Sequence, residues 1–167
     1  MNLAVLAPDW ALYSLIGLLV LAALQDAAQL KISNYICVAV LLLGIVTAVI
    51  VGPGWPLWQN LLVFAVALAL GTWLFGAGIL GGGDVKLFAV TVLWFDLGSA
   101  LPFLLAVAIA GGLLAILIIV LRLFGWSDRI RRRVKVLQPK AGIPYGIAIA
   151  AGAMLAIAMF MRSPGVA

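Results

Sequence analysis

Long apolar stretches follow one another along this sequence, and charged residues fall almost entirely between them. A helix needs about 20 residues to cross the roughly 30 Å hydrocarbon layer of a bilayer, and several stretches reach that length. The composition agrees, since 67% of the residues are hydrophobic and 9% are charged, and the mean hydropathy is +1.32. These values exclude a soluble globular domain. The sequence therefore predicts an all-α, polytopic membrane protein.

Charges and clusters of glycine and proline divide the sequence into six candidate transmembrane helices. They are expected at Trp10–Ala28, Asn34–Val51, Leu57–Phe75, Val85–Phe95, Ala100–Phe124 and Ile143–Met161. The fourth is short for a full crossing. The sequence contains no internal repeat and no linker, so residues 1–167 are expected to form a single transmembrane domain.

The basic residues predict the orientation, because cytoplasmic loops carry an excess of Lys and Arg. With the N-terminus outside, nine of the ten basic residues lie on the cytoplasmic side and only Arg162 lies outside. Without the fourth span, the best orientation would divide them seven against three. We therefore expect six spans with the N-terminus outside.

The tryptophans also fall near the expected span ends, which is typical of an interfacial belt, although a tryptophan can instead fill a contact between helices. The expected outer ends carry Trp10, Trp55, Trp58 and Trp94, and the inner ends carry Trp73 and Trp126.

The basic segment Arg129–Lys135 lies in the expected cytoplasmic loop before the last span. Such a segment fixes topology and contacts anionic lipid headgroups, so we expect no nucleic-acid partner. Cys37 is the only cysteine and histidine is absent, which removes the usual zinc ligands. We expect neither a metal nor another cofactor, and nothing in the sequence indicates an oligomeric state.

All five acidic residues are aspartates, and two of them lie where a charge is costly. Asp26 falls at the inner end of the first expected span, and Asp84 begins the fourth on the same side. An aspartate at the centre of a membrane helix costs roughly 2.5 to 3.5 kcal/mol, less near the interface, and usually faces protein or water. Solvation or local pairing explains Asp9, Asp96 and Asp128. Asp26 and Asp84 are therefore the candidates for function.

Two carboxylates that converge can share one proton, because the like charge raises one pKa while the other group stays ionised. The ionised member can take a proton from a water that attacks an amide carbonyl, and the protonated member can polarise that carbonyl. The helix N-terminus at Asp84 favours its charged form, so the sequence does not assign the base.

A simpler interpretation pairs Asp26 with Lys31 and Asp84 with Lys86, so that each aspartate merely ends a helix. Residues two apart do not face each other on a helix, however, and Lys86 is expected to extend toward the headgroups.

Two further motifs lie on the same side as the acids. Gly81–Gly83 precedes Asp84, and glycines permit irregular backbone at membrane depth and close approach of an extended substrate. Without Asp84 this run would be interpreted as a flexible hairpin. Pro144–Gly146 opens the last span and is followed by small residues that allow close helix packing.

At these positions the sequence resembles the prepilin peptidases, which are membrane aspartic proteases with a Gly-x-Gly-Asp motif. That motif is similar to Gly81–Asp84. Asp26, followed by the segment Lys31–Asn34, resembles the first catalytic aspartate with its basic-Ile-Pro-Asn element, and Pro144–Ala150 resembles the motif of the last helix. Ser33 stands where the family usually has proline, which is expected to loosen that turn.

The resemblance implies an intramembrane aspartic endopeptidase that removes the leader peptide of type IV prepilins or pseudopilins at the cytoplasmic boundary of the inner membrane. Asp26 and Asp84 would be the catalytic pair. The implied cleft and supporting residues are Gly81, Gly82, Gly83, Lys86, Asn34, Pro144, Tyr145 and Gly146.

The resemblance also implies a short, peptidase-only type such as that of tight-adherence (Tad) pili. Larger members carry an N-terminal segment whose cysteine pairs bind zinc, and they also methylate the new N-terminus. This sequence has one cysteine, so neither that segment nor methyltransferase activity is expected.

Three alternatives remain open. A preflagellin or archaellin peptidase would share the chemistry and differ in substrate. A small proton-coupled transporter would carry protons on the two aspartates, although transporters usually have repeated halves and acids near mid-membrane. A non-catalytic pilus assembly factor is the third.

Overall fold

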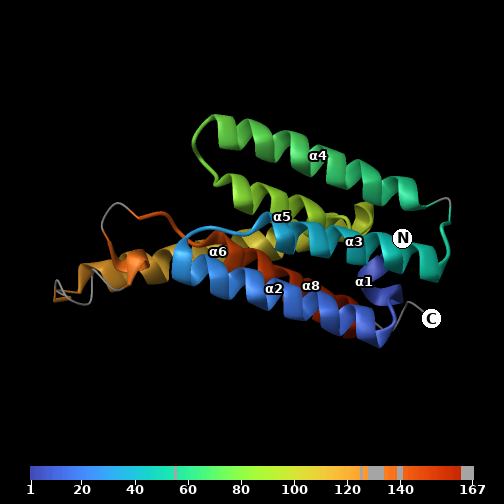
Figure 1. Cartoon of the computed structure of the whole chain (residues 1–167), viewed down its shortest axis with the longest axis horizontal. Coiled ribbons are helices and arrows are strands. Elements are labelled where there is room, and N and C mark those ends of the chain that lie inside the picture. The colour runs from blue at the N-terminus through green and yellow to red at the C-terminus, as the bar shows by residue number, and fades with distance from the viewer. Residues whose placement is uncertain (55, 125, 128–133, 139–140, 163–167) are drawn as a thin grey trace.

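The computed structural model describes residues 1–54, 56–124, 126–127, 134–138 and 141–162. These ranges contain helices and no strands, and the helices lie roughly along one common direction (Figure 1). The elements are α1 (Leu3–Leu6), α2 (Asp9–Gln29), α3 (Asn34–Val51), α4 (Leu57–Gly76), α5 (Gly82–Val92), α6 (Leu97–Leu123), the 3₁₀ helix η1 (Lys135–Leu137) and α8 (Tyr145–Arg162). The all-α class is therefore confirmed.

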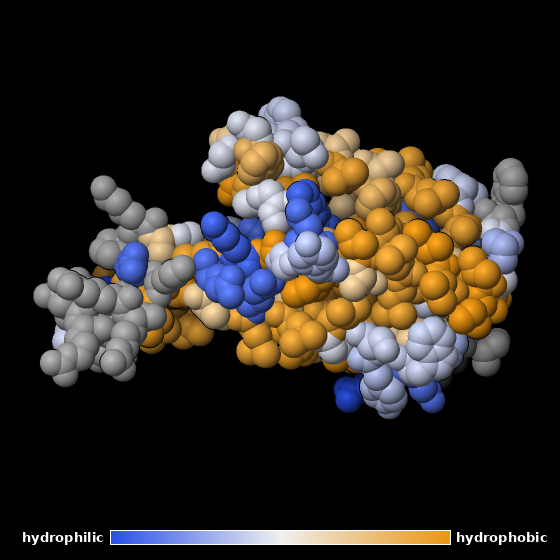
Figure 2. All heavy atoms as spheres, viewed as in Figure 1, coloured by the Kyte–Doolittle hydropathy of each residue, from blue (hydrophilic) through white to orange (hydrophobic). Residues whose placement is uncertain are grey.

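Five of the described helices are long and apolar enough to cross a bilayer, namely α2, α3, α4, α6 and α8. Their bounds agree with the expected spans within three residues. Hydrophobic residues cover much of the face shown in Figure 2, as a lipid-facing surface requires. The protein is therefore a multi-pass membrane protein.

The fourth expected span corresponds to α5, which has 11 residues and is therefore about 16 Å long. That length does not cross a bilayer as helix alone. Six spans with the N-terminus outside remain a prediction.

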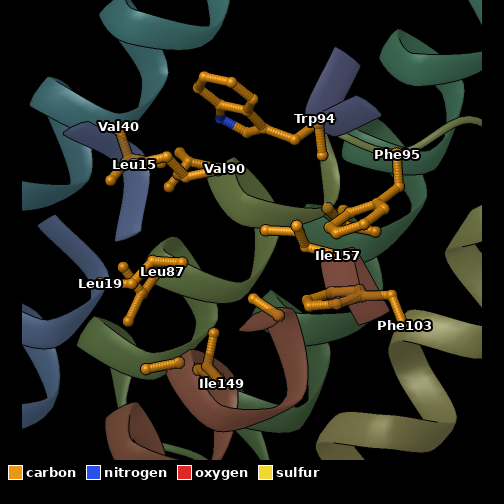
Figure 3. Close-up of a cluster of buried hydrophobic side chains, with 14 of the residues drawn as sticks. Leu15, Leu19, Val40, Leu87, Val90, Trp94, Phe95, Phe103, Ile149 and Ile157 are labelled. Atoms are coloured by element: carbon orange, nitrogen blue, oxygen red, sulfur yellow. The ribbon is translucent and has the colours of Figure 1, made fainter. Parts of the chain in front are cut away.

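The short helix α5 and the turn after it lie in the interior of the bundle. Leu87, Trp94 and Phe95 are fully buried. Figure 3 shows them among buried side chains of α2, α3, α6 and α8, which include Leu15, Leu19, Val40, Phe103, Ile149 and Ile157. Core packing thus fixes the helix that begins with Gly82, Gly83 and Asp84.

The prediction that Trp94 belongs to an interfacial belt is wrong, because its side chain is fully buried. Gly44 of α3 permits this position, since a Cβ there would lie 3.2 Å from Trp94 Nε1. Trp10, Trp58 and Trp73 are exposed, as a belt requires. Trp55 lies outside the described residues.

The expected close packing of the last helix is present between α6 and α8. A Cβ on Gly152 would lie 2.6 Å from the backbone nitrogen of Val107. Only glycine lets the two backbones approach this closely. This contact fixes α8, and with it Gly146, against the bundle.

A polar cluster, here called the Asn60–Asp96 cluster, lies where α5 ends. Asn60 is fully buried, and its amide nitrogen donates to the carbonyls of Met1, Leu93 and Phe95 at 2.8, 2.9 and 3.2 Å. Asp96 caps α6 by accepting from the backbone N–H and the hydroxyl of Ser99 at 2.9 and 2.7 Å. Its other oxygen lies 3.6 Å from the N-terminal amino group.

Burial alone would raise the pKa of Asp96. The hydrogen bonds from Ser99 and the charge of the N-terminal amino group outweigh burial and hold this pKa below its usual range.

Candidate active site

Asp26 lies one turn before the end of α2, and only 4% of its surface is exposed. The helix ends at Gln29, and the next residue, Leu30, has a left-handed backbone with φ of 55° and donates its N–H to the Asp26 carbonyl at 2.8 Å. The carboxyl oxygen Oδ2 of Asp26 accepts the backbone N–H of Gly146 at 2.7 Å. The first turn of α8 therefore holds this side chain in place.

Position 146 has room only for glycine. A Cβ there would lie 2.9 Å from Oδ2 and 3.0 Å from Cβ of Asp26, and 3.1 Å from Cδ1 of Ile32. Such short separations would force Asp26 away from the backbone N–H that it accepts. Gly146 thus positions the carboxylate of Asp26. Its small size by itself predicts only close helix packing.

Asp84 is partly buried in the first turn of α5, which begins after Gly81. A Cβ on Gly81 would lie 2.6 Å from Oδ2 of Asp84, so the glycine leaves space for the carboxyl group. The pKa of Asp84 is raised to about 6, first by burial and then by the charge of Asp26, against a lowering effect of a hydrogen bond with the Gly81 backbone.

The two aspartates therefore lie near enough to interact electrostatically, although 58 positions separate them in the sequence. Ile32 lies between the segments that carry them. A Cβ on Gly83 would lie 3.3 Å from the Ile32 backbone nitrogen, and the Ile32 side chain borders Gly146. Glycines at 83 and 146 thus let α5 and α8 close around the turn that follows Asp26.

The three glycines of the Gly81–Gly83 run differ in what surrounds them. The atoms nearest to a Cβ on Gly82 would be those of the Phe75 ring, from 3.3 Å, whereas Gly81 faces the Asp84 carboxyl and Gly83 faces the backbone and Cβ of Ile32. Gly81 and Gly83 therefore shape the site more strongly than Gly82 does.

The simpler interpretation of the aspartates is not supported by the contacts. Within the described ranges, neither Asp26 nor Asp84 forms an ion pair with a lysine. Lys86 is exposed and donates to Oδ1 of Asn34 at 3.0 Å, which ties α5 to α3. Lys31 is also exposed. Both carboxylates are left without a neutralising cation in this part of the chain.

Ser33 does not leave its turn loose. Its hydroxyl accepts the N–H of Tyr35 at 3.2 Å and caps α3. Its own N–H donates to Oε1 of Gln25 at 2.8 Å, a bond that proline cannot form. The sequence offered no signal for Gln25 or for the central place of Ile32.

Pro144 and Tyr145 lie at the start of α8 beside the site. Pro144 is fully buried, and its carbonyl accepts the N–H of Ile147 at 3.2 Å. Tyr145 and Asp84 both line a cavity of about 690 Å³ between α4 and α6. The motif at the start of the last helix thus borders both carboxylates.

Two further predictions from the sequence concern a metal site and the basic segment Arg129–Lys135. In the part of the chain that the structure describes, no three His, Cys, Asp or Glu side chains gather where they could hold a metal ion. Residues 129–133 of the basic segment lie outside the described residues.

Residues 13–116 match the model of the type IV leader peptidase family. The match includes Asp26 and the run from Gly81 to Asp84, and it ends before Pro144. No curated protein and no solved structure gives a match. Because the family match covers more than half of the chain, the protein belongs to the type IV leader peptidase family, whose members are peptidases with prepilin-type substrates.

Proposed function

We propose that this protein is an aspartic endopeptidase that removes the leader peptide of type IV prepilins or pseudopilins. The observation that carries the proposal is the meeting of Asp26 and Asp84 from separate helices, with no basic partner for either in the described ranges. Buried acids that are not neutralised by structural ion pairs are candidates for proton transfer.

The two carboxyl groups share one proton in the active form. The ionised group takes a proton from water as the water oxygen attacks the scissile carbonyl carbon, and the protonated group donates a hydrogen bond to the carbonyl oxygen. The carbon–nitrogen bond then breaks, and the departing amine receives a proton from the pair. A pKa of about 6 for Asp84 suits this role, because proton transfer is most efficient near the working pH.

The neighbouring residues support the pair without taking part in proton transfer. Gly81 is exposed, and an extended substrate segment can lie against the backbone of the glycine run because no side chain blocks it. Gly146 positions Asp26, and the bond between Lys86 and Asn34 holds the start of α5 next to α3.

We place the cut at the cytoplasmic boundary of the inner membrane, because the basic residues favour that side for the loops that carry both acids. Anionic headgroups near Arg129–Lys135 would hold this face at the membrane. We also assign leader cleavage without methyl transfer, as in a peptidase of the tight-adherence type, and the single cysteine of this sequence supports that assignment.

The test is leader cleavage by the purified protein in liposomes that contain a prepilin. Asp26→Asn and Asp84→Asn should each lower the rate by about 10³-fold, which lies within the roughly 10²- to 10⁴-fold contribution of a positioned acid or base. Asp9→Asn is the matched control, because Asp9 is exposed at the other end of α2. Native-like cleavage by either site variant, with helix content intact by circular dichroism, would contradict the proposal.

A further inference from the structure

The cavity beside Asp84 is a long groove between two helices, here called the α4–α6 groove. Its lining on α6 runs from Leu97 to Ala115, which is about 27 Å of helix. On α4 it runs from Leu62 to Leu74. The α4 wall is therefore about 18 Å long, and only the α6 wall approaches the roughly 30 Å hydrocarbon thickness of a bilayer.

The lining residues follow a helical repeat along both walls. On α6 they include Leu97, Leu101, Leu104, Ala108 and Gly112, and on α4 they recur at similar intervals. Residues three or four apart share one face of a helix. Each wall therefore presents one continuous stripe of apolar residues to the groove. Two helices present such stripes to a third helix that packs between them.

The groove is polar at one place along its length. Among the described residues that line it, Asp84 and Tyr145 alone have a polar side chain. Tyr145 lies near Gly111, since a Cβ on Gly111 would be 3.7 Å from its ring. From Leu97 to Gly111 the α6 wall thus offers about 21 Å of apolar length before it reaches Tyr145.

We propose that the α4–α6 groove binds the apolar membrane helix of the substrate and presents its end to Asp84. This inference rests on the proposed function. The occupant is a helix because both walls carry helical stripes and the α6 wall is about 27 Å long, and it is the substrate because the groove is continuous with the carboxyl group that acts on it. Small residues on α6, such as Ala108 and Gly112, let the incoming helix approach closely.

A second apolar cavity provides an internal control. It lies between α2 and α3, is lined by Gly17, Leu42 and neighbouring residues, and contains neither aspartate of the site. Gly17 and Gly112 are matched, because a Cβ on either would meet nothing within 4 Å. Leucine at either position should therefore fold, and only leucine at 112 should obstruct the proposed path.

The first experiment compares Gly112→Leu with Gly17→Leu on a prepilin embedded in liposomes. Gly112→Leu should lower its cleavage by at least about 10-fold, the size of effect that a steric mismatch has in an apolar pocket. Gly17→Leu should cut at the native rate. A native rate for Gly112→Leu would overturn the docking proposal. If the native protein does not cut the prepilin, the proposed function itself fails.

The second experiment identifies the occupant by photo-cross-linking in the Asp84→Asn background, which keeps the substrate intact. A benzophenone side chain at Leu104 should cross-link to the membrane helix of the prepilin, and one at Leu42 should not. Cross-links from Leu104 to lipid alone, or to a second copy of this chain, would overturn the assignment. A loss of cleavage in Gly112→Leu together with an absence of prepilin cross-links would also overturn it.

Discussion

Asp84 and Asp96 both lie at the N-terminus of a helix, one at the start of α5 and one shortly after its end, and their surroundings differ. Asp96 accepts two hydrogen bonds from Ser99 and pairs with an amino group, and its pKa is lowered. Asp84 has no ion pair in the described ranges, and burial and Asp26 raise its pKa. A carboxylate surrounded by donors stabilises the fold, whereas one that faces another acid keeps a proton available for chemistry.

The largest effect among the positioning residues should come from Gly146→Ala. The added Cβ would lie 2.9 Å from Oδ2 of Asp26, so the carboxyl group must move. A displacement of about 1 Å costs roughly 10²-fold in rate. Gly142→Ala is the control, because a Cβ at that position would meet nothing within 4 Å. Equal cleavage rates for the two variants would show that Gly146 does not position Asp26.

A substitution in the Asn60–Asp96 cluster should lower the stability of the fold and leave cleavage unchanged. Asn60→Ala leaves three carbonyls without this donor, and the hydrogen bonds to two of them, Leu93 and Phe95, are buried, which costs about 1–3 kcal/mol of folding free energy. Cleavage by the folded fraction should stay native, because this cluster lies at the other end of α5. Unfolding in detergent measured beside leader cleavage checks both points. If Asn60→Ala lost cleavage without losing stability, the two ends of α5 would not differ in role as proposed.

The smallest effect should come from the bond between Lys86 and Asn34. Lys86→Met and Asn34→Ala should each destabilise the fold by less than about 1 kcal/mol, because an exposed hydrogen bond contributes little. The double variant should cost less than the sum of the two single variants, since both remove the same contact. If the losses of stability in the two single variants added up to that of the double variant, the bond would not contribute to stability.

The sequence predicts the long helices well because span length and interrupting charges are local properties. It does not identify α5 as a short interior helix, since an apolar residue that faces protein and one that faces lipid look alike. For this reason the sequence predicts an interfacial position for Trp94, whose side chain is fully buried in the structure. Its burial depends on Gly44 of another helix, which no local pattern reports.

Some features of the candidate site can likewise be predicted from the local sequence, and others depend on tertiary packing. Asp26 and Asp84 stand out because charge is rare in this sequence. The hydrogen bond from Gly146 to Asp26 spans 120 positions and depends on how α8 packs. The α4–α6 groove is likewise invisible in the sequence, since its two walls are joined only by the tertiary fold.

The most direct test of the central claim is a titration of Asp84 by ¹³C NMR of carboxyl-labelled aspartate in lipid nanodiscs, with the signal assigned by its loss in Asp84→Asn. In the native protein the pKa of Asp84 should be about 6. In Asp26→Asn it should be lower, because the like charge is gone while burial remains. An unchanged pKa of Asp84 in Asp26→Asn would contradict a coupled pair of aspartates.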